Sequence, residues 1–305
     1  MNNDIKRATG LLVLEVVNSN PNGDPDRESD PRTRPNGLGE ISPVSLKRKL
    51  RDLVGDHDAP FFQSLPLEFR NDPEHYCILE SRGRDRSMIK KEMGKDTSKF
   101  DQEAFLKSLF VKKYWDARVF GNTFLEESKN REVEGDKSKM SKEYLKTGVV
   151  QMGMGLSISP VDVVRHTNTN KAGVQEGKNA GMAPMAYRVV EHGVYCMPFF
   201  VNPNYAKKSG CTATDIELLK LALPYVYDLN RSAIRPDVRI RHAWYITHKN
   251  ALGSCPDYLL LEALTPERIG DPKEPSSKWS DYRDKNGLPE ELLTRVESCI
   301  DLVDP

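Results

Sequence analysis

The sequence contains no long hydrophobic run and none of the common signatures of nucleotide or acyl chemistry. No stretch approaches the ~20 apolar residues that a membrane-spanning helix needs, and the first residues have no apolar signal core. A G-x-S-x-G motif, a G-x-x-x-x-G-K-[ST] motif and a G-x-G-x-x-G motif after a strand are all missing. We therefore expect a soluble protein without membrane contact, and nothing supports a nucleotide-hydrolysing or hydride-transfer enzyme.

Cysteine and histidine are too few and too scattered for the usual metal frameworks. The five cysteines form no C-x-x-C pair, and the six histidines show no H-x-x-x-H or H-E-x-x-H spacing. An odd number of cysteines without a signal segment is typical of a reducing compartment. The sequence predicts no metal, no cofactor and a cytoplasmic location.

The charge is balanced overall but unevenly distributed. The 305 residues contain 45 basic and 45 acidic side chains, whereas residues 262–305 contain 11 acidic and 6 basic ones. The rest of the chain is therefore mildly basic, and it can bind a polyanion. Residues 265–305 are expected to form a polar, acidic C-terminal extension.

The N-terminal part predicts a buried strand, a long loop and a cationic helix. Ala8 to Asn18 is almost entirely apolar, as in a central strand buried on both faces. Residues 20–39 are rich in proline and glycine and predict a structured loop. Ser42 and Pro43 then open an amphipathic helix as N-cap and first helical residue.

The remaining pattern predicts further strands around a second helix. Residues 147–164 and 187–201 read as paired strands flanking a polar arm, and 238–247 and 258–264 as two more strands. A capping box, Thr214-Asp215-Ile216-Glu217, opens a helix that reaches about Leu229 with a kink at Pro224. Strand, helix, strand, strand, helix, strand is the split βαβ order of a ferredoxin-like or RNA-recognition fold, so the fold class is α+β.

Four cations in five positions mark the first helix: Lys47, Arg48, Lys49 and Arg51. Lys47 and Arg51 are expected to share one exposed edge. A solvated surface and a phosphate-binding surface are equally good explanations of this cluster. A second cationic cluster follows the second helix: Arg231, Arg235, Arg239 and Arg241.

Two other features each allow two interpretations. Asp24, Asp26 and Asp30 could hold a catalytic cation, but aspartates in a Pro/Gly loop more often form turns with their own backbone, which we favour. The methionines Met152, Met154, Met182 and Met185 could wedge between bases or fill gaps in a core. Core packing is the better interpretation for Met152 and Met154.

Two stretches in the N-terminal part of the chain resemble a known family. The stretch from Asn18 to Asp26, followed by Ser45 to Arg51, resembles the N-terminal signature of the backbone subunit of type I CRISPR Cascade complexes. This is Cas family seven of the RAMP superfamily, with the type I-C Csd group as the nearest match and the type I-B Csh group as a near relative. Further matches follow in order at residues 116–121, 150–152, 230–233 and 248–253. Residues 27–44 differ from the family's usual sequence, with Glu40 to Val44 where the family tends to have a Val-Thr-Asp stretch.

The resemblance implies a single RNA-recognition-like domain over residues 1–305. It implies a palm, helical fingers inserted at 56–146 and a β-hairpin thumb at 160–188. Copies would stack head to tail in a helical filament on crRNA, beside other Cascade subunits, and present bases for pairing with target DNA. Such a subunit is not an enzyme. The residues expected to contact RNA are Asn20, Asn22, Lys47, Arg48, Lys49, Arg51, Gln151, Met152, Arg165, Lys171, Lys178, Met182, Met185, Arg231 and Arg235.

Two other hypotheses stay open. Related backbone subunits of type III systems cleave target RNA with an aspartate in this loop, so the alternative is a metal-dependent ribonuclease that uses Asp24 and Asp26. The other is a ferredoxin-like interaction module that does not bind RNA.

Overall fold

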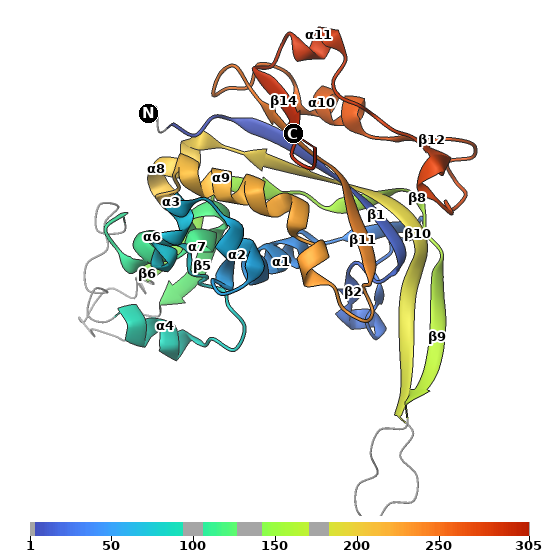
Figure 1. The fold of residues 1–305 in the computed structure, drawn as a ribbon, viewed down its shortest axis with the longest axis horizontal. Helices are drawn as coiled ribbons and strands as arrows, with labels where there is room; N and C mark the ends of the chain where they lie inside the picture. Colours follow the sequence, from blue (N-terminus) through green and yellow to red (C-terminus); the bar gives the residue numbers. More distant parts are fainter. Residues whose placement is uncertain (1–3, 94–105, 127–141, 171–182, 305) are drawn as a thin grey trace, which may run out of the picture.

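A large antiparallel sheet organises the chain (Figure 1). The computed structural model describes residues 4–93, 106–126, 142–170 and 183–304. In these ranges the eight-stranded sheet has the order β14-β11-β1-β10-β8-β4, and β7 and β9 pair with other parts of β10. Its strands are β1 (Ala8–Ser19), β4 (Leu38–Ile41), β7 (Val150–Met152), β8 (Gly155–Pro160), β9 (Val163–Asn170), β10 (Ala183–Val201), β11 (Asp237–Thr247) and β14 (Ser298–Asp301).

The predicted central strand is confirmed as β1, which lies between β10 and β11. Its side chains alternate between two cores: Leu12 and Leu14 belong to one, and Leu11 and Val13 to the other. Burial on both faces explains why this strand reads as one continuous apolar run.

Helices cover one face of the sheet (Figure 1). They include α1 (Pro43–Gly55), α2 (Pro60–Ser64), α7 (Trp115–Phe120) and α9 (Ala213–Ala222). Ser42 caps α1 as predicted, and its hydroxyl accepts a hydrogen bond from the Ser45 amide at 3.3 Å. The stripe Leu46, Leu50 and Val54 of α1 packs into the same core as Leu12 and Leu14 of β1.

The other face is covered by residues near the C-terminus. The prediction of a strand at 258–264 is wrong: these residues form α10 (Asp257–Leu264). Leu260 and Leu264, one helical turn apart, pack against Leu11 and Val13. The polar residues that follow also join the body, because Tyr282 and Val296 are buried in this core and β14 extends the sheet beside β11.

The second helix begins and ends differently from the prediction. The capping box is formed by Thr212 and Asp215, and the helix begins at Ala213. It ends at Ala222, before Pro224, and short 3-10 turns follow it. Proline cannot continue the α-helical hydrogen bonding, which explains the early end.

Short elements make up the segment between α1 and β7. In Figure 1 they lie to the left of the sheet, with α7 among them. No helix within the described ranges is long and apolar enough to span a membrane. The elements are α3 (Leu67–Arg70), the 3-10 helix Pro73–Tyr76, α4 (Arg86–Met93), α6 (Leu109–Lys113), β5 (Gly121–Glu126) and β6 (Lys142–Thr147).

The remaining short elements lie in loops and in the C-terminal part. They are β2 (Gly23–Asp24), the 3-10 helix Pro25–Arg27, β3 (Asp30–Pro31), the 3-10 helix Pro203–Tyr205, α8 (Ala206–Ser209), the 3-10 helices Leu223–Tyr225 and Asp228–Asn230, β12 (Glu267–Arg268), the 3-10 helix Trp279–Asp281, β13 (Tyr282–Arg283) and α11 (Glu290–Leu293).

The strands β9 and β10 extend beyond the sheet as a hairpin (Figure 1). Their pairing runs from Val163 opposite Val190 to Asn170 opposite Ala183. β10 therefore belongs to the centre of the sheet at one end and to the projecting hairpin at the other.

Two buried ion pairs join the helical segment to the rest of the body. Arg118 donates two hydrogen bonds to the carboxylate of Asp215, at 3.0 and 2.7 Å, and both side chains are buried. Arg51 of α1 donates to Asp116 at 2.8 Å, and both are again buried. Asp116 also accepts hydrogen bonds from the amides of Leu79 and Glu80. Neighbouring residues of α7 thus hold α1, α9 and the 79–80 backbone together.

Replacing Arg118 by Met should lower the free energy of unfolding by about 3–5 kcal/mol, because Asp215 is left as an unpaired buried charge. Urea unfolding measures this change. Adding Asp215→Asn removes that charge while keeping an acceptor for the helix cap, and should recover much of the loss. The exposed pair Arg283–Glu267 is the control: Arg283→Met should cost less than about 1 kcal/mol. An equally small cost for Arg118→Met would contradict the structural role of the buried pair.

Candidate nucleic-acid interface

The loop after β1 is fixed by asparagine side chains. Asn18 adopts a positive φ of 42°, and the chain turns there. Asn20 donates from its backbone amide to Ile234 O at 2.7 Å and from Nδ2 to Ser29 O at 2.8 Å. Oδ1 of Asn22 accepts a hydrogen bond from the Ser42 amide at 2.7 Å. The loop therefore links the end of β1, the start of α1 and the 231–236 turn.

Asp24 lies in this loop as a turn-forming residue, as we favoured. Its Oδ1 accepts a hydrogen bond from the Asp26 amide at 3.2 Å and caps the short 3-10 helix that follows. Its carboxylate also lies 3.7 Å from the Arg32 guanidinium. Among the residues that the structure describes, no group of three or more His, Cys, Asp or Glu side chains could hold a metal ion.

Lys49 of α1 is a buried cation beside this loop. Its side chain is 6% exposed, its Nζ lies 2.8 Å from Ser45 Oγ, and it lies 5.1 Å from the centre of the Tyr227 ring. No described carboxylate forms an ion pair with it. Burial, and after it the nearby charge of Arg235, lowers the pKa of Lys49 from 10.5 to about 7, against a smaller opposing effect of the Asp52 carboxylate.

Arg235 brings a second cation to the same place. Burial lowers the pKa of its guanidinium, and Arg82 adds like charge to both Arg235 and Lys49. Its Nε is buried without a hydrogen-bond partner. Asn230 connects the two segments, because its Nδ2 donates to Lys49 O at 3.2 Å. We call Asn20, Lys49, Tyr227 and Arg235 the cation site.

The other three cations of α1 differ in their exposure to solvent and in their partners. The expectation that Arg51 shares an exposed edge with Lys47 is wrong, because Arg51 is 6% exposed and paired with Asp116 and Glu80. Lys47 is half-buried, with Nζ 5.2 Å from the centre of the Phe120 ring, and burial lowers its pKa. Arg48 donates to Glu80 O. Arg51 therefore supports the fold and is not available to phosphate.

Gln151 and Met152 point in opposite directions from β7. Gln151 is exposed, and its Nε2 donates to Gly148 O at 3.0 Å. Met152 is 9% exposed and belongs to the main core. The core interpretation of Met152 is confirmed, and its side chain does not face solvent as an RNA contact would. Arg231 is exposed and pairs with Asp228 at 2.9 Å.

The base of the hairpin is tied to the loop after β1 by ion pairs. Arg165 contacts Asp30 at 3.1 Å, and Arg188 contacts Asp30 at 3.0 Å and also pairs with Glu28. Met185 lies in β10 opposite Asn168. The expected contacts Lys171, Lys178 and Met182 lie outside the described residues.

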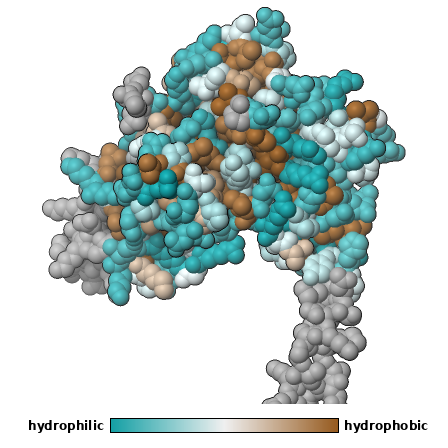
Figure 2. Space-filling model, viewed as in Figure 1, coloured by the Kyte–Doolittle hydropathy of each residue, from teal (hydrophilic) through white to brown (hydrophobic). Residues whose placement is uncertain are grey.

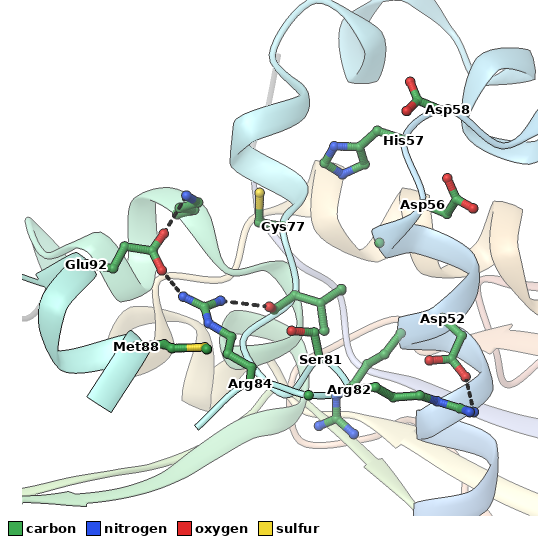
Figure 3. Close-up of a pocket in the computed structure, with 15 residues that line it drawn as sticks. Asp52, Asp56, His57, Asp58, Cys77, Ser81, Arg82, Arg84, Met88 and Glu92 are labelled. Carbon is green, nitrogen blue, oxygen red and sulfur yellow. Dashed lines mark hydrogen bonds and ion pairs between the residues drawn. The ribbon is translucent and has the colours of Figure 1, made fainter. Parts of the chain in front are cut away.

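A pocket of about 880 Å³ lies between the C-terminal end of α1, residues 77–84 and α4, and no residue of the cation site lines it (Figure 3). Figure 3 shows Arg82 reaching Asp52 at the end of α1, and Arg84 paired with Glu92 of α4. Neither Arg82 nor Tyr227 is among the residues that the sequence predicts to contact RNA. The sequence could not predict that these two side chains lie near Lys49, because each is more than thirty positions away from it in the chain.

The surface around these elements is mixed in polarity (Figure 2). Hydrophilic side chains cover much of the face shown, and hydrophobic ones gather in patches between them. The margin of the molecule is hollowed beside the base of the β9–β10 hairpin.

Comparison with known proteins agrees with the resemblance. The family model described as CRISPR-associated protein Cas7 matches residues 6–285. The chain belongs to the Cas7 family. A curated Cas7 protein of Haloferax volcanii is 24% identical over 228 residues, which cover 70% of this chain and 62% of that protein. The chain thus spans less than two thirds of that relative's length.

Two solved structures resemble this Cas7 family member more distantly. A chain of a CRISPR RNA-guided surveillance complex in a pre-nicking state has a TM-score of 0.45 and 12% identity, covering 79% of this chain and 78% of that one. A chain of a second CRISPR RNA-guided surveillance complex has a TM-score of 0.36 and 13% identity, covering 78% and 68%.

Lys49→Met should stabilise the isolated protein by about 0.5–2 kcal/mol at pH 7, because it removes a buried charge that forms no ion pair within the described part of the chain. The lowered pKa sets the pH window. The penalty is absent above about pH 10.5, grows as the pH falls, and is fully present below about 7. Thermal unfolding at several pH values measures it. Lys273→Met, at an exposed lysine, should change little; a Lys49→Met variant less stable than the wild type would show that the ammonium stabilises the fold.

Proposed function

We propose that this Cas7 family chain is a non-catalytic backbone subunit of a type I CRISPR Cascade effector that binds crRNA through its phosphates. The observation that carries the proposal is the cation site, in which Lys49 and Arg235 form no ion pair with a carboxylate of the described residues and lie beside the Asn20 loop. Membership of the Cas7 family supports it. The further assignment to type I-C rests on the sequence motifs alone.

A bound phosphate would supply the missing counter-charge. Two desolvated like charges destabilise the isolated chain. An anion bound between them removes this electrostatic penalty, and the free energy recovered strengthens binding. Phosphate contacts position a strand without reading its sequence. Affinity would come from counter-ion release along the RNA, and the bases would stay free to pair with target DNA.

The architecture supports the proposed division into palm, fingers and thumb. The order β11-β1-β10-β8, with α1 following β1 and α9 following β10, is that of a split βαβ palm. Residues 56–146 would be the fingers, and the β9–β10 hairpin within 160–188 the thumb (Figure 1). The C-terminal extension would belong to the palm, because Tyr282 and Val296 are buried in its core and β14 pairs with β11. Other copies of this chain, stacked head to tail, and other Cascade subunits are the proposed partners.

The double variant Lys49→Met, Arg235→Met should lose RNA binding while staying folded. Each lost phosphate contact should also reduce the slope of log affinity against log salt by about 0.7 for a single strand. Fluorescence anisotropy with single-stranded RNA, over a series of salt concentrations, measures both quantities. Lys273→Met is the matched control and should leave affinity and slope unchanged. Unaltered binding by the double variant would refute the cation site as the RNA contact.

RNA affinity should also depend on pH through Lys49. The free ammonium titrates near pH 7, and a bound phosphate raises that pKa, so binding takes up a proton. Affinity should therefore be constant below about pH 7 and fall as the pH rises above it. In Lys49→Arg the charge persists at every pH, so the fall should disappear between about pH 6 and 9. If the affinity of the wild type and of Lys49→Arg changed with pH in the same way, Lys49 would not be a contact of the bound phosphate.

A further inference from the structure

Three polar atoms of the cation site are buried without a hydrogen-bond partner among the described residues: Asn20 Oδ1, Tyr227 Oη and Arg235 Nε. An unpaired buried polar group costs roughly 1–3 kcal/mol, so folded proteins tolerate few of them. Arg235 Nε is a donor and suits a phosphate oxygen. Asn20 Oδ1 is an acceptor, so its partner must be a hydrogen-bond donor and cannot be a phosphate oxygen.

The orientation of the Asn20 amide is fixed by the loop. Its Nδ2 donates to Ser29 O at 2.8 Å. Turning the amide over would place Oδ1 against that carbonyl oxygen, where two acceptors repel each other. The side chain is 4% exposed, and the backbone amide of the same residue is bonded to Ile234 O. Oδ1 is therefore held as a buried acceptor of a residue whose backbone is bonded to the 231–236 turn.

The chemistry of a nucleic-acid strand offers few partners for such an acceptor. A phosphate oxygen carries no hydrogen at neutral pH and cannot donate to Oδ1. The amino groups of bases differ from one base to the next, so a contact that serves any guide sequence cannot depend on them. The 2′-hydroxyl of ribose is a donor, lies on the backbone next to each phosphate, and is absent from DNA.

We propose that Asn20 Oδ1 accepts a hydrogen bond from a ribose 2′-hydroxyl and so makes the cation site selective for RNA over DNA. This inference rests on the proposed function, because the strand must first place its phosphate at Lys49 and Arg235. The 231–236 turn is largely exposed and is bonded to the Asn20 amide through Ile234 O. This turn must shift for the strand to reach Asn20 Oδ1.

The wild-type chain provides the first test. Anisotropy compares three strands of one sequence, each too short to bridge two copies: RNA, DNA and 2′-fluoro RNA. The 2′-fluoro strand keeps the sugar pucker of RNA and lacks the donor. RNA should bind roughly 10-fold more tightly than either of the others, the factor that one hydrogen bond of this kind supplies. A 2′-fluoro strand that binds as well as RNA would mean that the site reads backbone shape, and the proposal would fail.

The same loop provides a matched pair of variants. Asn20→Ala should bind RNA and 2′-fluoro RNA with equal, weakened affinity, so that the preference disappears. Asn22→Ala alters an asparagine whose Oδ1 already accepts from the Ser42 amide. It should weaken both strands by the same factor and leave the roughly 10-fold ratio intact. A ratio that survives Asn20→Ala would overturn the assignment, and thermal unfolding of each variant checks that it is folded.

The same binding measurements distinguish a lack of sugar selectivity from a lack of RNA binding. If the wild type binds RNA, DNA and 2′-fluoro RNA equally, the cation site is a phosphate site without sugar selectivity, and only the role of Asn20 is lost. If the wild type binds none of the strands, the proposed function is lost as well. If Asn20→Ala does not fold, the wild-type comparison alone decides the proposal.

Discussion

The arrangement of the molecule depends on two ion pairs made by adjacent parts of α7. Asp116 accepts hydrogen bonds from Arg51 and from two backbone amides, and Arg118 donates hydrogen bonds to Asp215 near the start of α9. Buried ion pairs add little net stability compared with apolar residues, but they tolerate only one geometry. They set the position of α1 relative to the helical segment. That position determines which cations of α1 are neutralised and which remain unpaired.

The contrast between Arg51 and Lys49 follows from this geometry. Both side chains are buried on the same helix, two positions apart, yet Arg51 faces carboxylates and Lys49 faces a tyrosine ring and another cation. A chain selected only for stability would not keep an uncompensated ammonium there. Functional sites commonly keep such locally unfavourable groups, because a ligand removes the penalty. Protein stability and ligand affinity are therefore opposed at this one side chain.

The sequence was a good guide where a single local cause dominates. The apolar run of β1, the Ser42-Pro43 start of α1 and the paired strands around the hairpin were predictable because burial on both faces, capping and turn chemistry are local. Residues 258–264 were not, since an apolar run of that length fits a helix or a strand equally well. The burial of Lys49 and the pairing of Arg51 depend on Tyr227, Arg235 and Asp116, which the fold brings together over long sequence distances.

The strand β10 has a mechanical consequence. Its nineteen residues run from pairing with β1 at the middle of the sheet to pairing with β9 in the projecting hairpin. The strand is continuous across the junction of the two parts, where Arg165 and Arg188 form salt bridges to Asp30. A displacement of the hairpin strands is therefore expected to strain the hydrogen bonds between β10 and β1 at the centre of the sheet.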